Sequence, residues 1–445
     1  MYNIIKNILI ILTGFAVAAP ARAQQTPTAG TPVQLTLQEV WSQAEQNNKS
    51  IQMQQLSVRS SEEGVKDARA ERLPEINTLG EYGYVSNLAL YENGLFRSPS
   101  QFPVLHTFYR VGADAAVNLY SGNKTNLKIK EQETIRQLRE EQKRLTVSDI
   151  KFRASQYFLE LRRGIIFRGL MQANIAEQQK QLDRIRVLQK NGVVLKSDVL
   201  RAELQLSRQK LTLEQIENDM AIANQKLNIV IGQPDNTPVT PLTGQDSVAL
   251  PVKTYQDYLA EALQNSHQSK ISEQETELRR LELKDVKANV LPKIGLFGNY
   301  AYSYPQIQFY PYAATLYGLG TAGIRASFSI SAFYHNKHKV KSYELEYQRQ
   351  ELEHQDTQDA IRQQVNEAYL RYKEALDRIT VAQTNIRQAA ENARIVNNTY
   401  FNQLSLVTDL LQSNTEVLQT QFDLAAAQIA AQLQYYQLQK VIGNL

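Results

Sequence analysis

The chain has 445 residues, no cysteine and a formal net charge of +4, which excludes disulfides, zinc thiolates and cysteine nucleophiles. With 19 Gly, 13 Pro and a mean hydropathy of −0.42, its composition favours long helices over a compact enzyme with many turns. The small net charge argues against a nucleic-acid-binding protein.

The N-terminus has the features of a secretory signal peptide. Lys6 supplies a positive charge, residues 8–18 form an apolar run, and Ala21-Arg22-Ala23 provides a small-residue cleavage site. We therefore expect residues 1–23 to be removed and residues 24–35 to form an N-terminal segment without a lipid anchor, since no cysteine follows the cleavage site. No later stretch approaches 18 apolar residues, so membrane contact must come through something other than a transmembrane helix.

The rest of the chain is an internal duplication. Residues 36–232 align with residues 254–445, first at an offset of 218, which pairs Pro74 with Pro292, and later at an offset of 211, which pairs Asp198 with Asp409. Residues 233–253 are rich in Pro, Thr and Gly, as is typical of an irregular connector. Two copies of this length indicate a duplicated domain and not a solenoid of short repeats.

Each half is predicted to contain a helix, two strands, a long helix and a return helix. The first helix, 36–72, should end before Pro74. Strands are expected at about 75–91, 104–120, 293–304 and 316–331, because apolar and polar residues alternate there. In the strand at 104–120, for example, Val111 and Val117 lie on one face and Arg110 and Asp114 on the other.

The helices that follow the strands carry a seven-residue repeat. Val365, Tyr372 and Ile379 recur at sevens, with Ala368 and Ala375 between them, which indicates a coiled-coil seam with small residues. An antiparallel bundle and an open helical barrel both fit this seam. A helix over 122–190 would span roughly 104 Å, about the length of the helices 36–72 and 195–231 placed end to end, so we expect a tube or rod.

The four strands are long enough to cross a bilayer when tilted. Four strands cannot close a barrel, and open edges are not tolerated in lipid, so membrane insertion requires an oligomer; a trimer would supply twelve strands and a channel. The polar residues Arg110, Asp114 and Arg325 suit a wet barrel lumen. A soluble β-sandwich is the alternative interpretation of the same alternation.

Taken together, these features resemble a known family. The signal peptide, the duplicated halves, NGVVLKSDVL at 191–200 with its counterpart NQLSLVTDLL at 402–411, and half-repeats that end in Ile-Gly are similar to the TolC-like outer-membrane efflux proteins. The resemblance implies an α+β membrane protein, a homotrimer with a twelve-stranded β-barrel in the outer membrane of a Gram-negative bacterium, continued by a long α-helical coiled-coil barrel in the periplasm. It also implies three kinds of partner, a periplasmic adaptor (membrane fusion) protein, an inner-membrane pump and outer-membrane lipid.

The resemblance also assigns roles to residues at the helix turns. The turns between long and return helices would form the periplasmic tip and contact the adaptor; their residues are Asn191, Gly192, Val193, Gln403, Leu404 and Ser405. Asp409 matches the aspartate that rings the channel constriction of the family. The chain departs from the family pattern at Gln412, where a second acid is often found, and at Gln403, where a glycine is expected. Asp198 is better explained as a helix cap, and for Asp409 a cap and a constriction role remain open.

Other candidate sites are weak. His335 and His338 have metal-like spacing but no acid nearby, so a basic contact with lipid headgroups at the inner face of the membrane is the better interpretation. No nucleophile elbow, phosphate loop or acid pair indicates an enzyme, and no cofactor is expected. The sequence therefore predicts a passive exit duct of a tripartite efflux or type I secretion system; the alternative is a structural coiled-coil protein or a surface adhesin.

Overall fold

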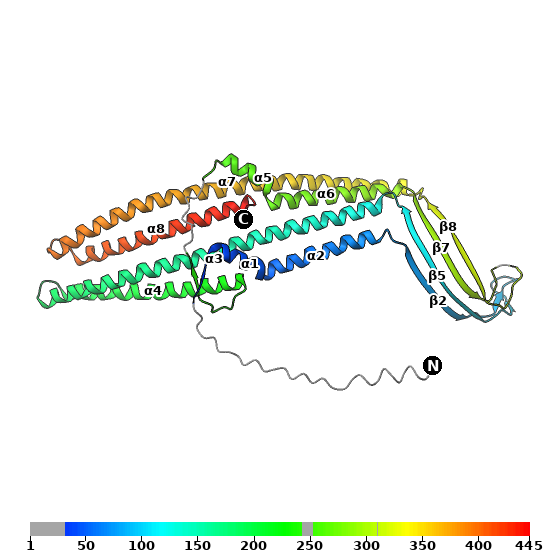
Figure 1. Cartoon of the computed structure of the whole chain (residues 1–445), viewed down its shortest axis with the longest axis horizontal. Coiled ribbons are helices and arrows are strands. Elements are labelled where there is room, and N and C mark those ends of the chain that lie inside the picture. The colour runs from blue at the N-terminus through cyan, green and yellow to red at the C-terminus, as the bar shows by residue number, and fades with distance from the viewer. Residues whose placement is uncertain (1–31, 243–251, 309) are drawn as a thin grey trace, which may run out of the picture.

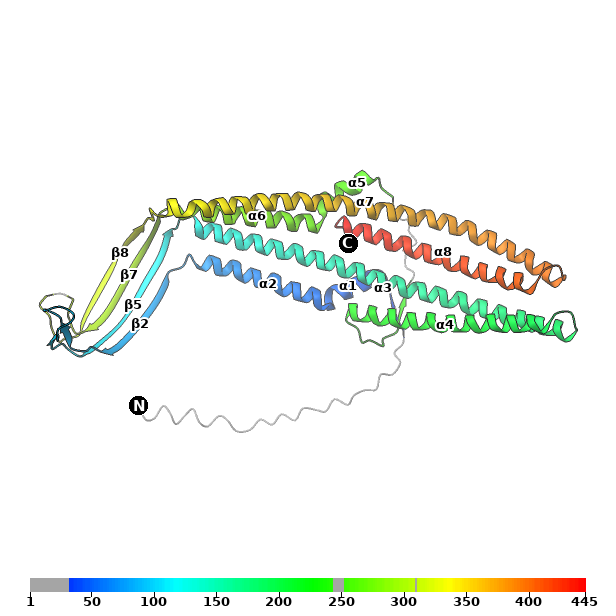
Figure 2. The same cartoon turned by 180° about the vertical axis from the view of Figure 1, so that it is seen from behind.

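The computed structural model describes residues 32–242, 252–308 and 310–445. The predicted signal peptide and part of the connector lie outside these residues. The molecule is elongated, with a tilted sheet at one end and long helices that run away from it to two turns at the other end (Figure 1). Short elements, among them α1 and α5, pack on the long helices partway along their length, as the reverse view also shows (Figure 2).

The two repeats contain the same main elements in the same order. The first repeat and the short strands around it comprise β1 (Val33–Leu35), α1 (Leu37–Asn47), α2 (Lys49–Ala70), β2 (Glu75–Tyr84), β3 (Leu88–Leu90), β4 (Ser100–Phe102), β5 (Thr107–Tyr120), α3 (Lys124–Lys190), α4 (Lys196–Ile231) and β6 (Val239–Pro241). The second comprises α5 (Tyr255–Asn265), α6 (His267–Lys287), a 3-10 turn (Ala288–Val290), β7 (Lys293–Tyr304), β8 (Tyr317–Ser327), α7 (Ala332–Phe401) and α8 (Val407–Val441).

The expected helix over 36–72 is broken into α1 and α2 at Asn48, which has an extended backbone. The Asn48 side chain accepts from the amide of Ser50 at 3.0 Å, so it caps α2, and donates to the carbonyl of Val230 at 3.1 Å. Asn47 donates to the carbonyl of Ile231 at 3.0 Å. The break thus satisfies the free carbonyl groups at the end of α4, a contact between residues far apart in the sequence.

The long helices each pack along two shorter ones. The 67-residue α3 lies against α2 and α4, and the 70-residue α7 lies against α6 and α8. The return helices end at Gly232 and Gly443, whose φ values of 73° and 80° favour glycine. A Cβ at Gly232 would lie 2.5 Å from Cβ of Asn47, so the end of α4 sits directly against the break between α1 and α2.

The sheet is antiparallel in the order β2-β5-β7-β8. The pairing of β5 with β7 joins the two repeats, and β2 and β8 are the edges. The long helices also join the repeats, since α3 contacts α6 and α8.

Three strands are shorter than the alternation predicts. The segment expected at 75–91 ends as a sheet strand at Tyr84, and Leu88–Leu90 pairs instead with Ser100–Phe102 in a separate small hairpin. The strand expected at 104–120 begins at Thr107. The strand expected at 316–331 covers Tyr317–Ser327, because the amide of Ala332 bonds to the carbonyl of Ser329 and this turn begins α7.

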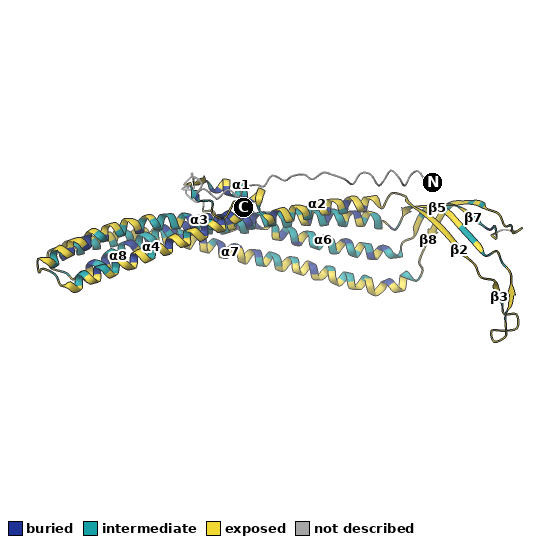
Figure 3. Cartoon of the chain, turned by 90° about the horizontal axis from the view of Figure 1, so that it is seen from below, coloured by how far each residue is buried: buried dark blue, intermediate teal, exposed yellow. Residues whose placement is uncertain are grey.

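The seven-residue seam faces the helix contacts. Val365 and Tyr372 are fully buried, and Ala368, Ala375 and Ala382 are nearly so. Buried residues follow the inner sides of the helices while the outer sides are exposed (Figure 3). The largest core cluster joins α1, α3 and α4 and includes Val40, Phe158 and Leu227.

Candidate functional site

One face of the sheet carries a row of polar side chains across all four strands. Register places Asn77, Asp114, Asn299 and Thr321 opposite one another. The Asn77 amide donates to Oδ2 of Asp114 at 3.3 Å, and the Thr321 hydroxyl donates to Oδ1 of Asn299 at 2.8 Å. Such cross-strand pairs hold the polar face in one register.

The three residues expected in the lumen share this polar face. Asp114 belongs to the row described above, Arg110 lies opposite Glu81 on β2, and Arg325 stacks over the ring of Phe297 with 4.7 Å between the guanidinium carbon and the ring centroid. Phe297 and Asn77 also lie on this face, although neither was among the residues expected there. The sequence signal for both residues is their position in the two-residue alternation of β7 and β2, which places them on the polar face.

The other face of the sheet is apolar and exposed. Its members alternate with the polar row along every strand; they include Ile76, Tyr82, Val111, Leu296, Tyr300 and Ile324. Ile76 and Ile324 are 70% and 71% exposed, so no surface of the described residues covers these side chains. An exposed apolar face opposite a polar one is typical of strands that separate lipid from water.

The two tip turns have the same backbone despite different sequences. Asn191 and Asn402 end the long helices, and Gly192 and Gln403 follow with φ values of 74° and 64°. The amides of Val193 and Leu404 then bond back to the carbonyls of Leu188 and Thr399 at 2.9 and 2.8 Å.

The tip turns leave apolar side chains in solvent. Leu404 is 77% exposed, and Leu195, Leu406 and Val193 are also exposed. In the second turn the Ser405 hydroxyl accepts from the hydroxyl of Thr399 at 3.2 Å. The turns are therefore shaped by their own hydrogen bonds while their leucines stay free for a partner.

A buried cluster fixes the ends of the two helix hairpins to each other. Ile185 from α3, Tyr400 from α7 and Leu410 from α8 pack together within it. Burial raises the pKa of Tyr400, and the negative charge of Asp198 raises it further. The Tyr400 hydroxyl is buried and has no hydrogen-bond partner among the described residues.

The two paired aspartates both stabilise the start of a return helix. Oδ2 of Asp409 accepts from the amide of Leu406 at 3.1 Å, and Oδ2 of Asp198 accepts from the amide of Leu195 at 3.3 Å. Asp409 is exposed and Asp198 is half-buried. Both aspartates therefore support a helix start from its third position and are not the N-cap residues themselves, which are Leu195 and Leu406. The constriction role of Asp409 stays a prediction.

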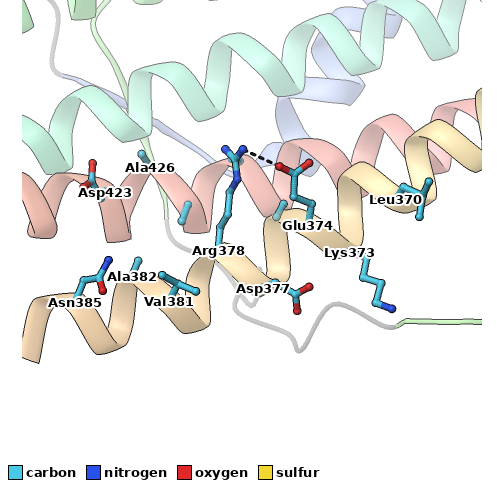
Figure 4. A pocket seen from close by; sticks show the side chains of 13 residues that line it. Leu370, Lys373, Glu374, Asp377, Arg378, Val381, Ala382, Asn385, Asp423 and Ala426 are labelled. Carbon is cyan, nitrogen blue, oxygen red and sulfur yellow. Dashed lines mark hydrogen bonds and ion pairs between the residues drawn. The ribbon is translucent and has the colours of Figure 1, made fainter.

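Asp409 begins a polar stripe along the exposed side of α8. Gln412 donates to Glu416 at 3.2 Å, and Gln419 donates to Asp423 at 2.8 Å. The stripe reaches a shallow groove of about 730 Å³ between α7 and α8, which is lined by small residues such as Ala426 and by the ion pair of Arg378 with Glu374 at 2.7 Å (Figure 4).

Membrane-spanning helices and metal-binding clusters are absent from the described part of the chain. No helix there has the length and apolar content needed to cross a membrane. No group of three or more His, Cys, Asp or Glu side chains in residues 32–242, 252–308 and 310–445 is arranged to hold a metal ion. His335 and His338 are both exposed near the start of α7.

A sheet with one polar and one apolar face, continued by long paired helices, is the fold of outer-membrane channels. Several solved structures share it, including the three described next. The outer-membrane channel OprN is 14% identical, with 92% of this chain and 90% of that chain covered and a TM-score of 0.77. The outer membrane protein VceC from Vibrio cholerae is 14% identical, with 92% and 96% covered and a TM-score of 0.75. CusC is 15% identical, with 95% and 96% covered and a TM-score of 0.79.

The first repeat also matches a known family in sequence. Residues 40–233 match the family described as outer membrane efflux protein. No curated protein matches the chain significantly. The first repeat thus resembles that family, and the described chain as a whole has the fold of these outer-membrane channels.

Proposed function

We propose that three copies of this chain form an exit duct that conducts substrates passively across the periplasm and the outer membrane. The observation that carries the proposal is the four-stranded sheet, with one apolar and one polar face and two free edges, at the end of a helical body. Energy for transport would come from a partner, since the family is one of channels.

The free edges of the sheet set the oligomer. Unpaired backbone groups at β2 and β8 would each cost several kcal/mol in lipid, so β2 of one copy should pair with β8 of the next. Two copies would give eight strands, whose interior is filled by side chains, and three would give twelve strands with room for a channel. Arg110, Asp114 and Arg325 would then line a wet lumen.

The tip turns are the surface for an adaptor. Their exposed leucines, including Leu195 and Leu404, offer apolar contacts on a rigid hairpin end. We infer that a periplasmic adaptor protein binds here and couples the duct to an inner-membrane pump, in a tripartite efflux or a type I secretion system. Cross-linkers placed in residues 402–407 should capture that adaptor in cells.

The constriction is proposed to lie where three copies of Asp409 and Gln412 approach the axis. The polar stripe of α8 continues with Glu416 and Asp423, whereas α4 has Gln205 and Thr212 at the matching positions. Three such stripes around one axis would attract cations and repel anions.

Conductance separates this function from the alternative of a structural coiled-coil protein or adhesin. The purified protein should run as a heat-modifiable trimer and give stepwise, cation-preferring currents in a planar bilayer. A monomer released into the periplasmic fraction, or trimers that never conduct, would contradict the proposal.

A further inference from the structure

The junction between β8 and α7 combines aromatic and basic side chains. We name it the junction patch, and its members are Phe328, Ile330, Phe333, Tyr334, His335, Lys337, His338 and Lys339. The apolar alternation of β8 through Ile324 continues in the sequence to Phe328 and Ile330, and the rings of Phe328 and Phe333 meet edge to face at 5.8 Å. Ile330 is 73% exposed, so the apolar surface of the sheet extends up to the start of the helix.

The basic side chains of the patch are exposed to solvent. His335, Lys337, His338 and Lys339 are all exposed, and none forms an ion pair in the described part of the molecule. The start of α7 is held instead by Asn336, which is buried and donates to the carbonyl of Val286 at 2.7 Å. The fold therefore anchors this turn through one polar side chain and leaves the cations outside.

The first repeat offers an internal comparison. At the start of α3, Lys124 donates to Asp285 at 3.3 Å and to Asn289 at 2.6 Å, and Lys128 forms an ion pair with Glu71. Two of the three lysines in this segment are thus neutralised, and Lys130 is the one that has no ion pair within the described residues. In the second repeat the corresponding segment keeps one such pair, Lys341 with Glu344 at 3.8 Å, whereas Lys337 and Lys339 have no ion pair among the described residues.

Free cations at this place carry an energetic cost. They repel one another, and an external anion would relieve that repulsion.

The distances suit the headgroup layer of a membrane. From Phe333 to Lys339 the helix rises roughly 9 Å, close to the depth of about 5–8 Å that headgroups occupy on each side of the hydrocarbon core. Aromatic residues at the acyl boundary followed by basic residues match the order of layers that a chain meets on leaving a bilayer.

We propose that the junction patch binds the phosphates of anionic phospholipids in the periplasmic leaflet, with Lys337 and Lys339 as the principal contacts and Phe333 and Tyr334 at the acyl boundary. Residues two apart on a helix do not face each other, so each lysine would meet its own phosphate. The proposal rests on the membrane orientation given by the proposed function. It adds a lipid-class preference, which a channel held by apolar contact alone would lack.

Native mass spectrometry of the purified oligomer tests the proposal. The oligomer is incubated with palmitoyl-oleoyl phosphatidylglycerol or with phosphatidylcholine of the same acyl chains, and retained lipids are counted. We expect phosphatidylglycerol to be retained at least about threefold more than phosphatidylcholine, and this preference to disappear in Lys337→Gln/Lys339→Gln. The control is Lys373→Gln/Arg387→Gln, which removes two exposed, unpaired cations from the same helix far from the junction and should keep the preference.

Three outcomes would overturn the lipid site. They are equal retention of both lipids by the unaltered protein, an undiminished preference in the junction variant, or an equal loss in the control variant. If the junction variant keeps its lipid preference but its trimers dissociate at lower temperature, the lysines instead pair with acids of a neighbouring copy. Conductance of the unaltered protein is measured in parallel, so failure of the duct is distinguished from failure of the lipid site.

Discussion

The carboxylate of Asp409 accepts a hydrogen bond from the backbone amide of Leu406, 3.1 Å away, at the first turn of α8. The residue proposed to set the charge of the constriction therefore also holds the start of the helix. Asp409→Asn should separate the two roles, because an amide oxygen still accepts the bond but carries no charge. We expect a clear loss of cation preference, measured as the reversal potential across a tenfold KCl gradient.

Asp198, the residue of the first repeat that corresponds to Asp409, provides the control for charge. Asp198→Asn, which changes the equivalent contact with Leu195, should leave the reversal potential unchanged. Asp409→Ala should lose the cap as well, at about 1 kcal/mol, and hydrogen exchange of residues 406–410 should rise. Equal effects of the two Asp→Asn changes would argue against a constriction at Asp409.

The second prediction concerns the left-handed residue of each tip turn. A Cβ at Gly192 would meet nothing within 4 Å, so substitution there costs only the backbone strain of a positive φ. Gly192→Ala should destabilise the first turn by about 1 kcal/mol, and Gln403→Gly should stabilise the second by a similar or smaller amount. Hydrogen exchange at the two tips should move in opposite directions; a change of the same sign at both would contradict this account.

The third prediction tests the two faces of the sheet. Ala115 and Ala116 are neighbours near the middle of β5 but lie on opposite faces, opposite Gly298 and Phe297. Ala115→Arg should place a charge in lipid at about 2–4 kcal/mol and reduce the trimer in outer membranes, whereas Ala116→Arg should be tolerated and alter conductance. Heat-modifiability assays on membrane extracts measure the first effect, and the reverse pattern would invert the assignment of faces.

The fourth prediction concerns pH. Burial, and then the negative charges of Glu282 and Asp285, raise the pKa of Glu131. Its folded pKa exceeds its unfolded pKa, so the charged group destabilises the fold above the folded pKa and this penalty vanishes below the unfolded value. Glu131→Gln should therefore raise Tm at pH 7, on the order of 1–2 °C, and have little effect at pH 4.

Glu39 provides a control, because its pKa shifts in the opposite direction to that of Glu131. Hydrogen bonds from the backbone and hydroxyl of Thr36 lower the pKa of Glu39. Its contribution to stability is present above its unfolded pKa and lost as the pH falls through the folded pKa. Glu39→Gln should thus lower Tm at pH 7 and not at low pH; a parallel response of the two variants would show that the pH effect does not arise at these sites.

Much of the fold could be predicted because local sequence patterns specify its helices and strands. The two-residue alternation around Arg110 and Asp114 identifies a strand with one polar face. The seven-residue repeat through Val365 and Tyr372 identifies a long packed helix. The break at Asn48 could not be predicted this way, because its reason is the end of α4, whose carbonyl groups Asn48 must satisfy. Gln403 likewise shows no local sign that it adopts the left-handed backbone of Gly192.

The sequence by itself determined the order of elements, the duplication and the family resemblance, since periodicity and turn residues act over a few neighbouring positions. Only the tertiary structure decided which strands pair between the repeats, which aspartate oxygens are occupied by backbone amides, and which lysines are neutralised. Lys124 and Lys337 are the same residue type near the start of a long helix. Lys124 contacts Asp285 and Asn289, whereas Lys337 contacts no acid among the described residues. That difference depends on contacts between residues more than a hundred positions apart, which local sequence does not specify.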